Sequence, residues 1–129
     1  MSIREFADRY IAAQKDAWQN GNFGVLEELE DENVIFHQEV DVVGREAHKN
    51  YIVMASQSVS ELHQDWEYLT GAENIYALSY KATGVIEKEI PGTNFPVGKK
   101  VVNDLLFVFR LDNEKIAEAW VKGNMTVLD

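Results

Sequence analysis

The chain has 129 residues, the common size of a single domain, and 46% of them are apolar, which is enough to fill one core. It has no cysteine, which excludes a disulfide framework, a thiolate metal site and a cysteine nucleophile. Its 12 basic and 22 acidic side chains give a net charge of −10, so we expect no nucleic-acid partner and no membrane partner, because binding to either depends on local positive charge.

Two helices are expected at the start of the chain. Ser2 and Glu5 form a capping box, in which each side chain accepts a hydrogen bond from the other residue's amide. Apolar residues then recur every three or four positions until Gly21, a residue type that ends helices in the left-handed conformation. A short second helix is expected from Asn22 to the acidic run 30–32, because negative charge is unfavourable at a helix carboxyl end.

Strands dominate the rest of the predicted structure. A short strand over 33–38 leads through a loop to a third helix over 45–58. From there apolar and polar residues alternate, which is the period of β-strands. The strands expected in this part are 62–70, 75–87, 101–111 and 115–122. Helices set apart from an antiparallel sheet define the α+β class, and the chain has no repeat or linker that would divide it.

The predicted strand 101–111 is apolar on both of its faces, with Leu106 and Val108 on the second face. An antiparallel sheet normally presents one of its two faces to water, and that face is polar. Here both faces are apolar, and three helices cannot cover both. A partner subunit would cover the second one. We therefore expect a homodimer in which sheet face meets sheet face around Leu106 and Val108, with Asp104 and Arg110 at the rim.

The order and spacing of several short segments resembles the nuclear transport factor 2-like superfamily, in particular the SnoaL-like polyketide cyclases and the ketosteroid isomerases. These segments are 17–22 at the end of the first helix, 44–47 before the third, 96–101 before the long strand and 115–120 in the last strand. The resemblance implies a single SnoaL-like domain over 1–129. Its curved antiparallel sheet and three helices in the N-terminal half would form a cone-shaped pocket that holds a small apolar molecule.

The resemblance also implies candidate site residues. His37 aligns where the isomerases carry their carboxylate base, and histidine can transfer protons at neutral pH. Tyr10 is similar to their oxyanion-holding tyrosine but lies about one turn too far from the helix end, where Gln14 takes its place. Asn103 is the polar residue on the strand expected to carry the second isomerase acid. We expect His37 as proton-transfer group, Tyr10, Gln14 and Asn103 as donors, and Trp18, Phe107, Phe109 and Trp120 as apolar walls.

The cyclase and isomerase patterns are incomplete, so whether the chain is an enzyme stays open. Ile86 stands where the cyclases carry a histidine, and Val121 where an aspartate often follows the tryptophan of the last strand. If it is an enzyme, acid–base isomerase, cyclase or lyase chemistry beside a carbonyl is expected. The alternative is a non-catalytic dimeric ligand carrier or interaction module. The discriminating feature would be a second titratable group facing His37.

Cofactors and metals are not expected. The sequence has no dinucleotide fingerprint, phosphate-cradling glycine loop or nucleophile elbow. The pairs His37-x-Glu39 and His63-x-Asp65 could each place two metal ligands on one strand face, but such alternations are common on exposed strands. His48 is expected on the solvated side of the third helix. The amino terminus has no apolar signal core and no apolar run approaches the roughly 18 residues of a membrane span, so a cytoplasmic location is expected.

Overall fold

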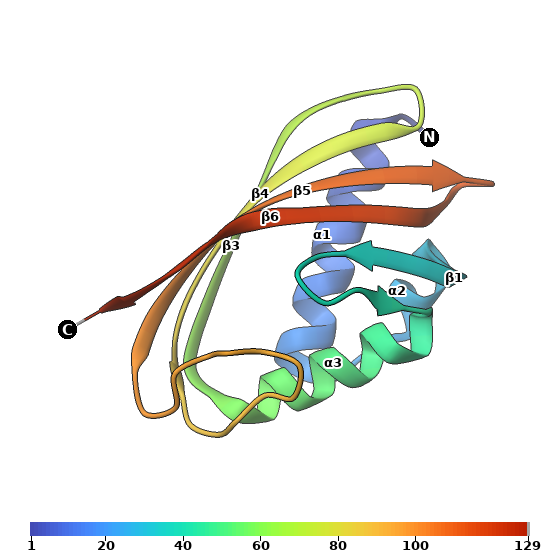
Figure 1. Cartoon of the computed structure of the whole chain (residues 1–129). Coiled ribbons are helices and arrows are strands. Elements are labelled where there is room, and N and C mark those ends of the chain that lie inside the picture. The colour runs from blue at the N-terminus through green and yellow to red at the C-terminus, as the bar shows by residue number, and fades with distance from the viewer. Residues whose placement is uncertain (129) are drawn as a thin grey trace.

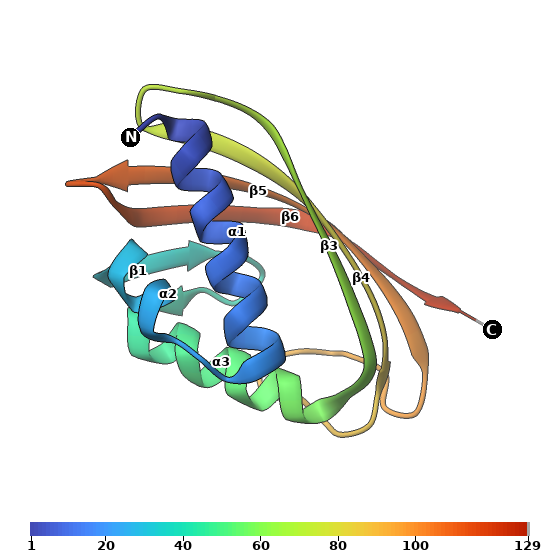
Figure 2. The same cartoon turned by 180° about the vertical axis from the view of Figure 1, so that it is seen from behind.

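A strongly curved sheet wraps around the first helix in the computed structural model, which describes residues 1–128 (Figure 1). All three helices lie on the concave side of the sheet, and the convex side carries none (Figure 2). In chain order the elements are α1 (Ile3–Asn20), α2 (Gly24–Leu29), β1 (Glu30–His37), β2 (Val42–Val43), α3 (Arg45–Ser58), β3 (Val59–Ala72), β4 (Ile75–Ile86), β5 (Lys100–Asp112) and β6 (Lys115–Leu128).

The helix boundaries follow the local signals of the sequence. The side chain of Ser2 accepts from the amide of Glu5, the reciprocal bond is also present, and Gly21 closes α1 at a φ of 68°. The third helix has the predicted bounds, Arg45–Ser58. No helix within residues 1–128 is long and apolar enough to cross a membrane.

The six strands pair in the order β2-β1-β6-β5-β4-β3. The predicted antiparallel pairing of the two long strands, β4 and β5, is confirmed, with Tyr80 opposite Leu105. The expectation of a wholly antiparallel sheet is wrong, because β1 runs parallel to β6 and pairs Phe36 with Ala119. A parallel pair needs a long connection, and here α3 and strands β2 to β5 lie between the two partners along the chain.

The core lies where α1 crosses the concave face. The ring of Tyr10 meets that of Phe109 edge-on at 5.1 Å between centroids, and Phe6 meets Tyr76 in the same way at 6.0 Å. These residues are almost completely buried. The side of α1 that carries Phe6 and Tyr10 therefore packs against the inner face of the sheet. This core fills one end of the concave side, and α3 and the loop 87–99 lie at the other end (Figure 1).

Candidate functional site

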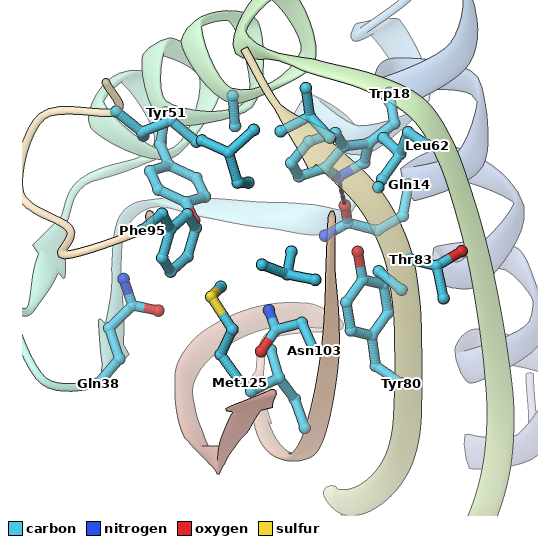
Figure 3. Close-up of a pocket in the computed structure, with 18 of the residues that line it drawn as sticks. Gln14, Trp18, Gln38, Tyr51, Leu62, Tyr80, Thr83, Phe95, Asn103 and Met125 are labelled. Atoms are coloured by element: carbon cyan, nitrogen blue, oxygen red, sulfur yellow. Dashed lines mark hydrogen bonds between the residues drawn. The ribbon is translucent and has the colours of Figure 1, made fainter. Parts of the chain in front are cut away.

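A cavity of about 110 Å³ lies between the concave face of the sheet, α1, α3 and the loop 87–99 (Figure 3). Its walls are mainly aromatic and aliphatic, and they come from every part of the chain. Aromatic side chains that line it are Trp18, Tyr51, Trp66, Phe95 and Phe107. A concave, mainly apolar space with a few polar groups is the usual form of a small-molecule site.

The polar groups that line the cavity come from separate elements. They include Gln14 of α1, Gln38 after β1, His48 of α3, Tyr80 and Thr83 of β4 and Asn103 of β5. Figure 3 shows the polar ends of Gln14, Tyr80 and Asn103 turned toward the middle of the cavity. Convergent polar groups in an apolar wall can fix the orientation of a ligand oxygen.

Tyr80 is held as a hydrogen-bond donor. The amide Nε2 of Gln64 donates to the Tyr80 hydroxyl over 2.8 Å, so the hydroxyl's own proton is available to a ligand. Burial raises the pKa of Tyr80 to about 12, with the Gln64 bond acting in the opposite direction. Tyr80 therefore stays protonated at neutral pH and can donate to a carbonyl oxygen.

A chain of hydrogen bonds leads from the cavity wall into the protein interior. The indole Nε1 of Trp18 donates to Oε1 of Gln14 over 3.1 Å, and Nε2 of Gln14 donates to the Tyr10 hydroxyl over 2.8 Å. Tyr10 in turn donates to Oε2 of Glu30 over 2.8 Å. Tyr10 thus forms its hydrogen bonds inside the protein core. Of the two expected donors of the first helix, Gln14 lines the cavity and Tyr10 does not.

Glu30 and His48 form a buried pair at the end of this chain. Nδ1 of His48 lies 3.1 Å from Oε1 and 2.9 Å from Oε2 of Glu30. Glu30 is only 1% exposed and His48 7% exposed. The expectation of a solvated His48 is wrong. The buried face of α3 contains His48, Ile52 and Ala55, at helical spacing, and the histidine belongs to that face.

Three of the expected ligand-binding residues line the cavity, namely Gln14, Trp18 and Phe107, and so does the expected donor Asn103. Their contact with a ligand stays a prediction. Phe109 is fully buried in the core against Tyr10 and is not part of the cavity wall.

His37 and Trp120 lie outside the cavity, on the convex face of the sheet. Phe36 of the same strand is turned inward and is 3% exposed, so the alternation of a strand turns His37 outward. There its ring stacks on Trp120 at 5.6 Å between centroids, and Trp120 is 39% exposed. The expectation that His37 faces an aromatic cavity is therefore wrong, and so is that of Trp120 as a cavity wall.

His37 belongs to a charged cluster instead. Its Nε2 lies 2.7 Å from Oε2 of Glu118, its Nδ1 lies 3.4 Å from Asp41, and Arg110 donates to the other oxygen of Glu118. The hydrogen bond to Glu118 raises the pKa of His37 above its ordinary value. The same bond, together with that from Arg110, lowers the pKa of Glu118.

The second histidine–carboxylate pair of the sequence lies on an exposed strand. The side chains of His63 and Asp65 are 75% and 72% exposed, with 3.7 Å between Nε2 and Oδ2. Over the part of the chain that the structure describes, no three His, Asp or Glu side chains gather in a way that could hold a metal ion.

A family model described as SnoaL-like polyketide cyclase matches residues 9–128. The chain belongs to the SnoaL-like polyketide cyclase family. No curated protein sequence matches this SnoaL-like chain.

Solved structures share its nuclear transport factor 2-like fold at low sequence identity. TsrD from Streptomyces laurentii is 15% identical with a TM-score of 0.80, over 96% of this chain and 92% of that one. SalBIII, an epoxide hydrolase/cyclase-like enzyme of pyran ring formation in the polyether salinomycin, is 18% identical with a TM-score of 0.70, over 99% and 100%. An NTF2-like protein from Anabaena variabilis is 16% identical with a TM-score of 0.67, over 94% and 88%.

Sequence reasoning missed three residues of this SnoaL-like site, Glu30, His48 and Tyr80. Glu30 is the first residue of the acidic run and was expected to mark only a helix end. The signal that could have found His48 is its spacing of four and seven from Ile52 and Ala55, which places it on an apolar helix face. Tyr80 shares the inward face of its strand with Leu78 and Ala82, a period-two signal available in the sequence.

Proposed function

We propose that this SnoaL-like protein binds a small, mainly apolar molecule with a carbonyl or hydroxyl oxygen in the cavity, and that it catalyses isomerisation or ring closure beside that oxygen. The observation that carries the proposal is the set of polar side chains in an otherwise apolar wall, above all Tyr80 and Asn103. The family and the cyclase-like enzyme SalBIII, which shares the fold, support the same reaction class.

The physical basis is the stabilisation of charge away from water. When a proton leaves the carbon beside a carbonyl, negative charge develops on the oxygen. The Tyr80 hydroxyl and the Asn103 amide are donors that line the same apolar space, where a hydrogen bond to a charged oxygen is stronger than in water. Aromatic walls such as Trp66, whose ring lies 4.3 Å from that of Tyr80, exclude water and fix the donor.

A second candidate function is a non-catalytic ligand carrier. It is favoured by the position of His37, because the proton-transfer group expected from the sequence lies on the convex face. The amide of Asn103 can donate a hydrogen bond but cannot transfer a proton at neutral pH. The two functions share the same cavity, so a binding experiment alone does not separate them.

The first test is native mass spectrometry of the purified protein, to detect a small molecule that copurifies. Ala82→Phe adds a ring to the cavity wall and should remove the bound molecule, whereas Ala12→Phe, at an exposed position of α1, should leave it. The released molecule is then returned to the protein in D₂O. An enzyme exchanges carbon-bound hydrogen beside the oxygen for deuterium, and a carrier does not. A wild-type protein that neither carries nor binds any apolar molecule would contradict both functions.

A further inference from the structure

We infer that Glu30 and His48 form the proton-transfer pair of the cavity, in which His48 exchanges protons with the ligand at Nε2 and Glu30 positions its ring through Nδ1. This inference rests on the proposed function, because it supplies the base that such a reaction needs. The wall of the cavity includes His48, and the carboxylate of Glu30 lies behind it, bonded to the ring.

The hydrogen bond to Glu30 selects the tautomer of His48. A carboxylate only accepts hydrogen bonds, so a neutral ring bonded to it carries its proton on Nδ1. The unprotonated nitrogen is then Nε2, and none of the hydrogen bonds formed among residues 1–128 engages that atom. An unprotonated and unpaired ring nitrogen, on a residue that lines the cavity, is what a general base requires.

The ring of His48 is also held in place by packing. It stacks on Phe36, with 4.1 Å between centroids and 27° between the planes. Phe36 lines the same cavity and is 3% exposed. Stacking on one side and the carboxylate at Nδ1 together fix the orientation of the ring, so that Nε2 needs no rearrangement before it reacts.

The surroundings of Glu30 favour its role as the partner of an imidazolium. Tyr10 donates to it, and the pKa of Tyr10 is raised well above its ordinary value by burial and by the charge of Glu30, so the phenol keeps its proton. The pKa of Tyr76 is also raised well above its ordinary value, mainly by burial and also by the charge of Glu30. The buried hydroxyl of Tyr76 has no hydrogen-bond partner among the described residues. Arg45, the guanidinium on this side of α3, donates to the backbone carbonyls of Glu27 and Glu30.

These contacts leave the carboxylate of Glu30 with two hydrogen-bond donors, a phenol and an imidazole. Burial of a negative charge without a cation is unfavourable. When His48 takes a proton from the ligand, the ring becomes the cation that this carboxylate lacks. The protonated ring formed during the reaction would then lie 2.9 Å from a carboxylate oxygen of Glu30.

The reaction balances without a cofactor. His48 Nε2 takes a proton from the ligand carbon beside the carbonyl, the electron pair of that C–H bond forms a carbon–carbon double bond, and the carbonyl π electrons move to oxygen. Tyr80 and Asn103 donate hydrogen bonds to the resulting enolate oxygen. In an isomerisation, Nε2 returns the proton to a different carbon. In a ring closure, the enolate carbon attacks a second carbonyl carbon and Nε2 gives the proton to the new alkoxide oxygen.

A purely structural role for the pair is the competing explanation. A buried carboxylate bonded to residues of α1 and α3 also ties these helices to the start of β1, and its removal would destabilise the fold. The test must therefore include readouts that a structural role does not move. The rate of isotope exchange is such a readout, and the tautomer of the ring tests whether Nε2 is the unprotonated nitrogen that the inference requires.

The first experiment uses the wild-type protein labelled with ¹⁵N-histidine. Long-range ¹⁵N–¹H correlation spectra, recorded at a pH at which the rings are neutral, should show the proton of His48 on Nδ1 and that of the exposed His63 on Nε2, the form that free histidine prefers. In Glu30→Gln, the preference of His48 for Nδ1–H should be lost. A His48 ring that carries its proton on Nε2 in the wild-type protein would overturn the inference without any variant having to fold.

The second experiment uses 2-tetralone, an aromatic ketone with acidic hydrogens beside its carbonyl, in D₂O. Wild-type protein should accelerate deuterium incorporation measured by mass spectrometry, and His48→Gln should reduce the rate about 100-fold or more, the usual scale of general-base catalysis. Binding of the ketone, followed by tryptophan fluorescence, should be retained in His48→Gln. His63→Gln is the matched control and should exchange at the wild-type rate.

The outcomes separate the inference from the proposed function. Exchange by His48→Gln at the wild-type rate would overturn the role of His48 and leave the proposed function standing. Failure of the wild-type protein to bind 2-tetralone would count against the carbonyl-ligand function, and a neutral His48 ring that carries its proton on Nε2 would still overturn the pair. Urea denaturation of each variant shows whether a lost rate reflects a lost fold.

Discussion

The side-chain amide of Gln14 donates a hydrogen bond to the hydroxyl of Tyr10 over 2.8 Å, and this bond joins the cavity wall to the buried carboxylate of Glu30. Gln14 also accepts a hydrogen bond from the indole of Trp18, so its amide group bonds to both Tyr10 and Trp18. Both of these bonds lie within α1, at a spacing of four residues, where side chains of one helix face meet.

Replacement of Gln14 should therefore cost stability. Gln14→Leu removes the acceptor of the Trp18 indole and one donor to Tyr10, and we expect a loss of about 1–3 kcal/mol in the free energy of unfolding. Urea denaturation followed by circular dichroism measures it. Gln19→Leu, at an exposed position of the same helix, is the control and should change stability by no more than about 0.5 kcal/mol. Equal effects of the two variants would contradict the role of the buried chain.

The pKa of His37 should depend on Glu118. The hydrogen bond between them raises the pKa of His37 from its ordinary 6.5 and lowers that of Glu118 from 4.5. A pH titration followed by NMR should show a raised pKa for His37 in the wild-type protein. Glu118→Gln should bring it back toward 6.5, and Asp41→Asn, which removes the weaker partner at 3.4 Å, should lower it by less.

The sign of the stability effect follows from these two shifts. Because the folded pKa of His37 is raised, its contribution to stability is complete below the unfolded value of 6.5 and is lost as the pH rises through the folded value. Because the folded pKa of Glu118 is lowered, its contribution is lost as the pH falls through that lower value. The pair should therefore stabilise the fold most between pH 4.5 and 6.5. If the free energy of unfolding of Glu118→Gln depended on pH as that of the wild-type protein does, the pair would not contribute to stability.

We propose that two copies of the chain associate through the convex face of the sheet. This face carries no helix (Figure 1). Leu106 and Trp120 are 43% and 39% exposed on it. Asp104 and Arg110 lie on β5 at equal distances in sequence from Phe107. A two-fold axis near that point would place the acid of one copy opposite the base of the other.

The wild-type protein should then run as a dimer at micromolar concentration in light scattering. Leu106→Arg would place an unpaired charge in the interface and should give monomer or aggregate. Val97→Arg, at an exposed position of the loop 87–99, should remain dimeric. A monomeric wild-type protein would end this proposal.

The local structure was predictable because its signals lie close together in sequence. The capping box of Ser2 and Glu5 and the stop at Gly21 define α1, and alternation defines the long strands. The parallel pairing of β1 with β6 joins residues as far apart as Phe36 and Ala119, and no local pattern encodes it. Strand partners of this kind are decided by the packing of the whole sheet.

The site was predictable only where the sequence showed which residues of a strand or helix face inward. On β5, the inward set that contains Asn103 and Phe107 was placed correctly. On β1, the resemblance favoured His37, but the larger apolar ring of Phe36 takes the inward position and turns its neighbour outward. On α3, His48 was expected on the solvated side, but it shares the buried face with Ile52 and Ala55 and lines the cavity.

Gly123 of β6 lies where the neighbouring strand leaves no room for a side chain. A Cβ atom at this position would fall on the backbone carbonyl oxygen of Asp104 and would lie 2.8 Å from Cα of Leu105, both on the neighbouring strand β5. Backbone atoms cannot move aside as a flexible side chain can. Gly123→Ala should therefore force the strands apart and cost about 1–3 kcal/mol, the usual scale of overpacking.

The matched control is Gly24→Ala in α2. The nearest atom to a Cβ there is Oδ1 of Asn22 at 3.7 Å, an ordinary contact, and alanine restricts the unfolded chain more than glycine does. We expect this variant to keep or gain stability, by up to about 1 kcal/mol. Thermal unfolding of the two variants beside the wild-type protein makes the comparison.

Met125 lies on β6, the strand of Gly123, and lines the cavity. Gly123→Ala should therefore also weaken ligand binding, whereas Gly24→Ala should not. A Gly123→Ala protein as stable as Gly24→Ala would show that β5 and β6 tolerate a wider separation.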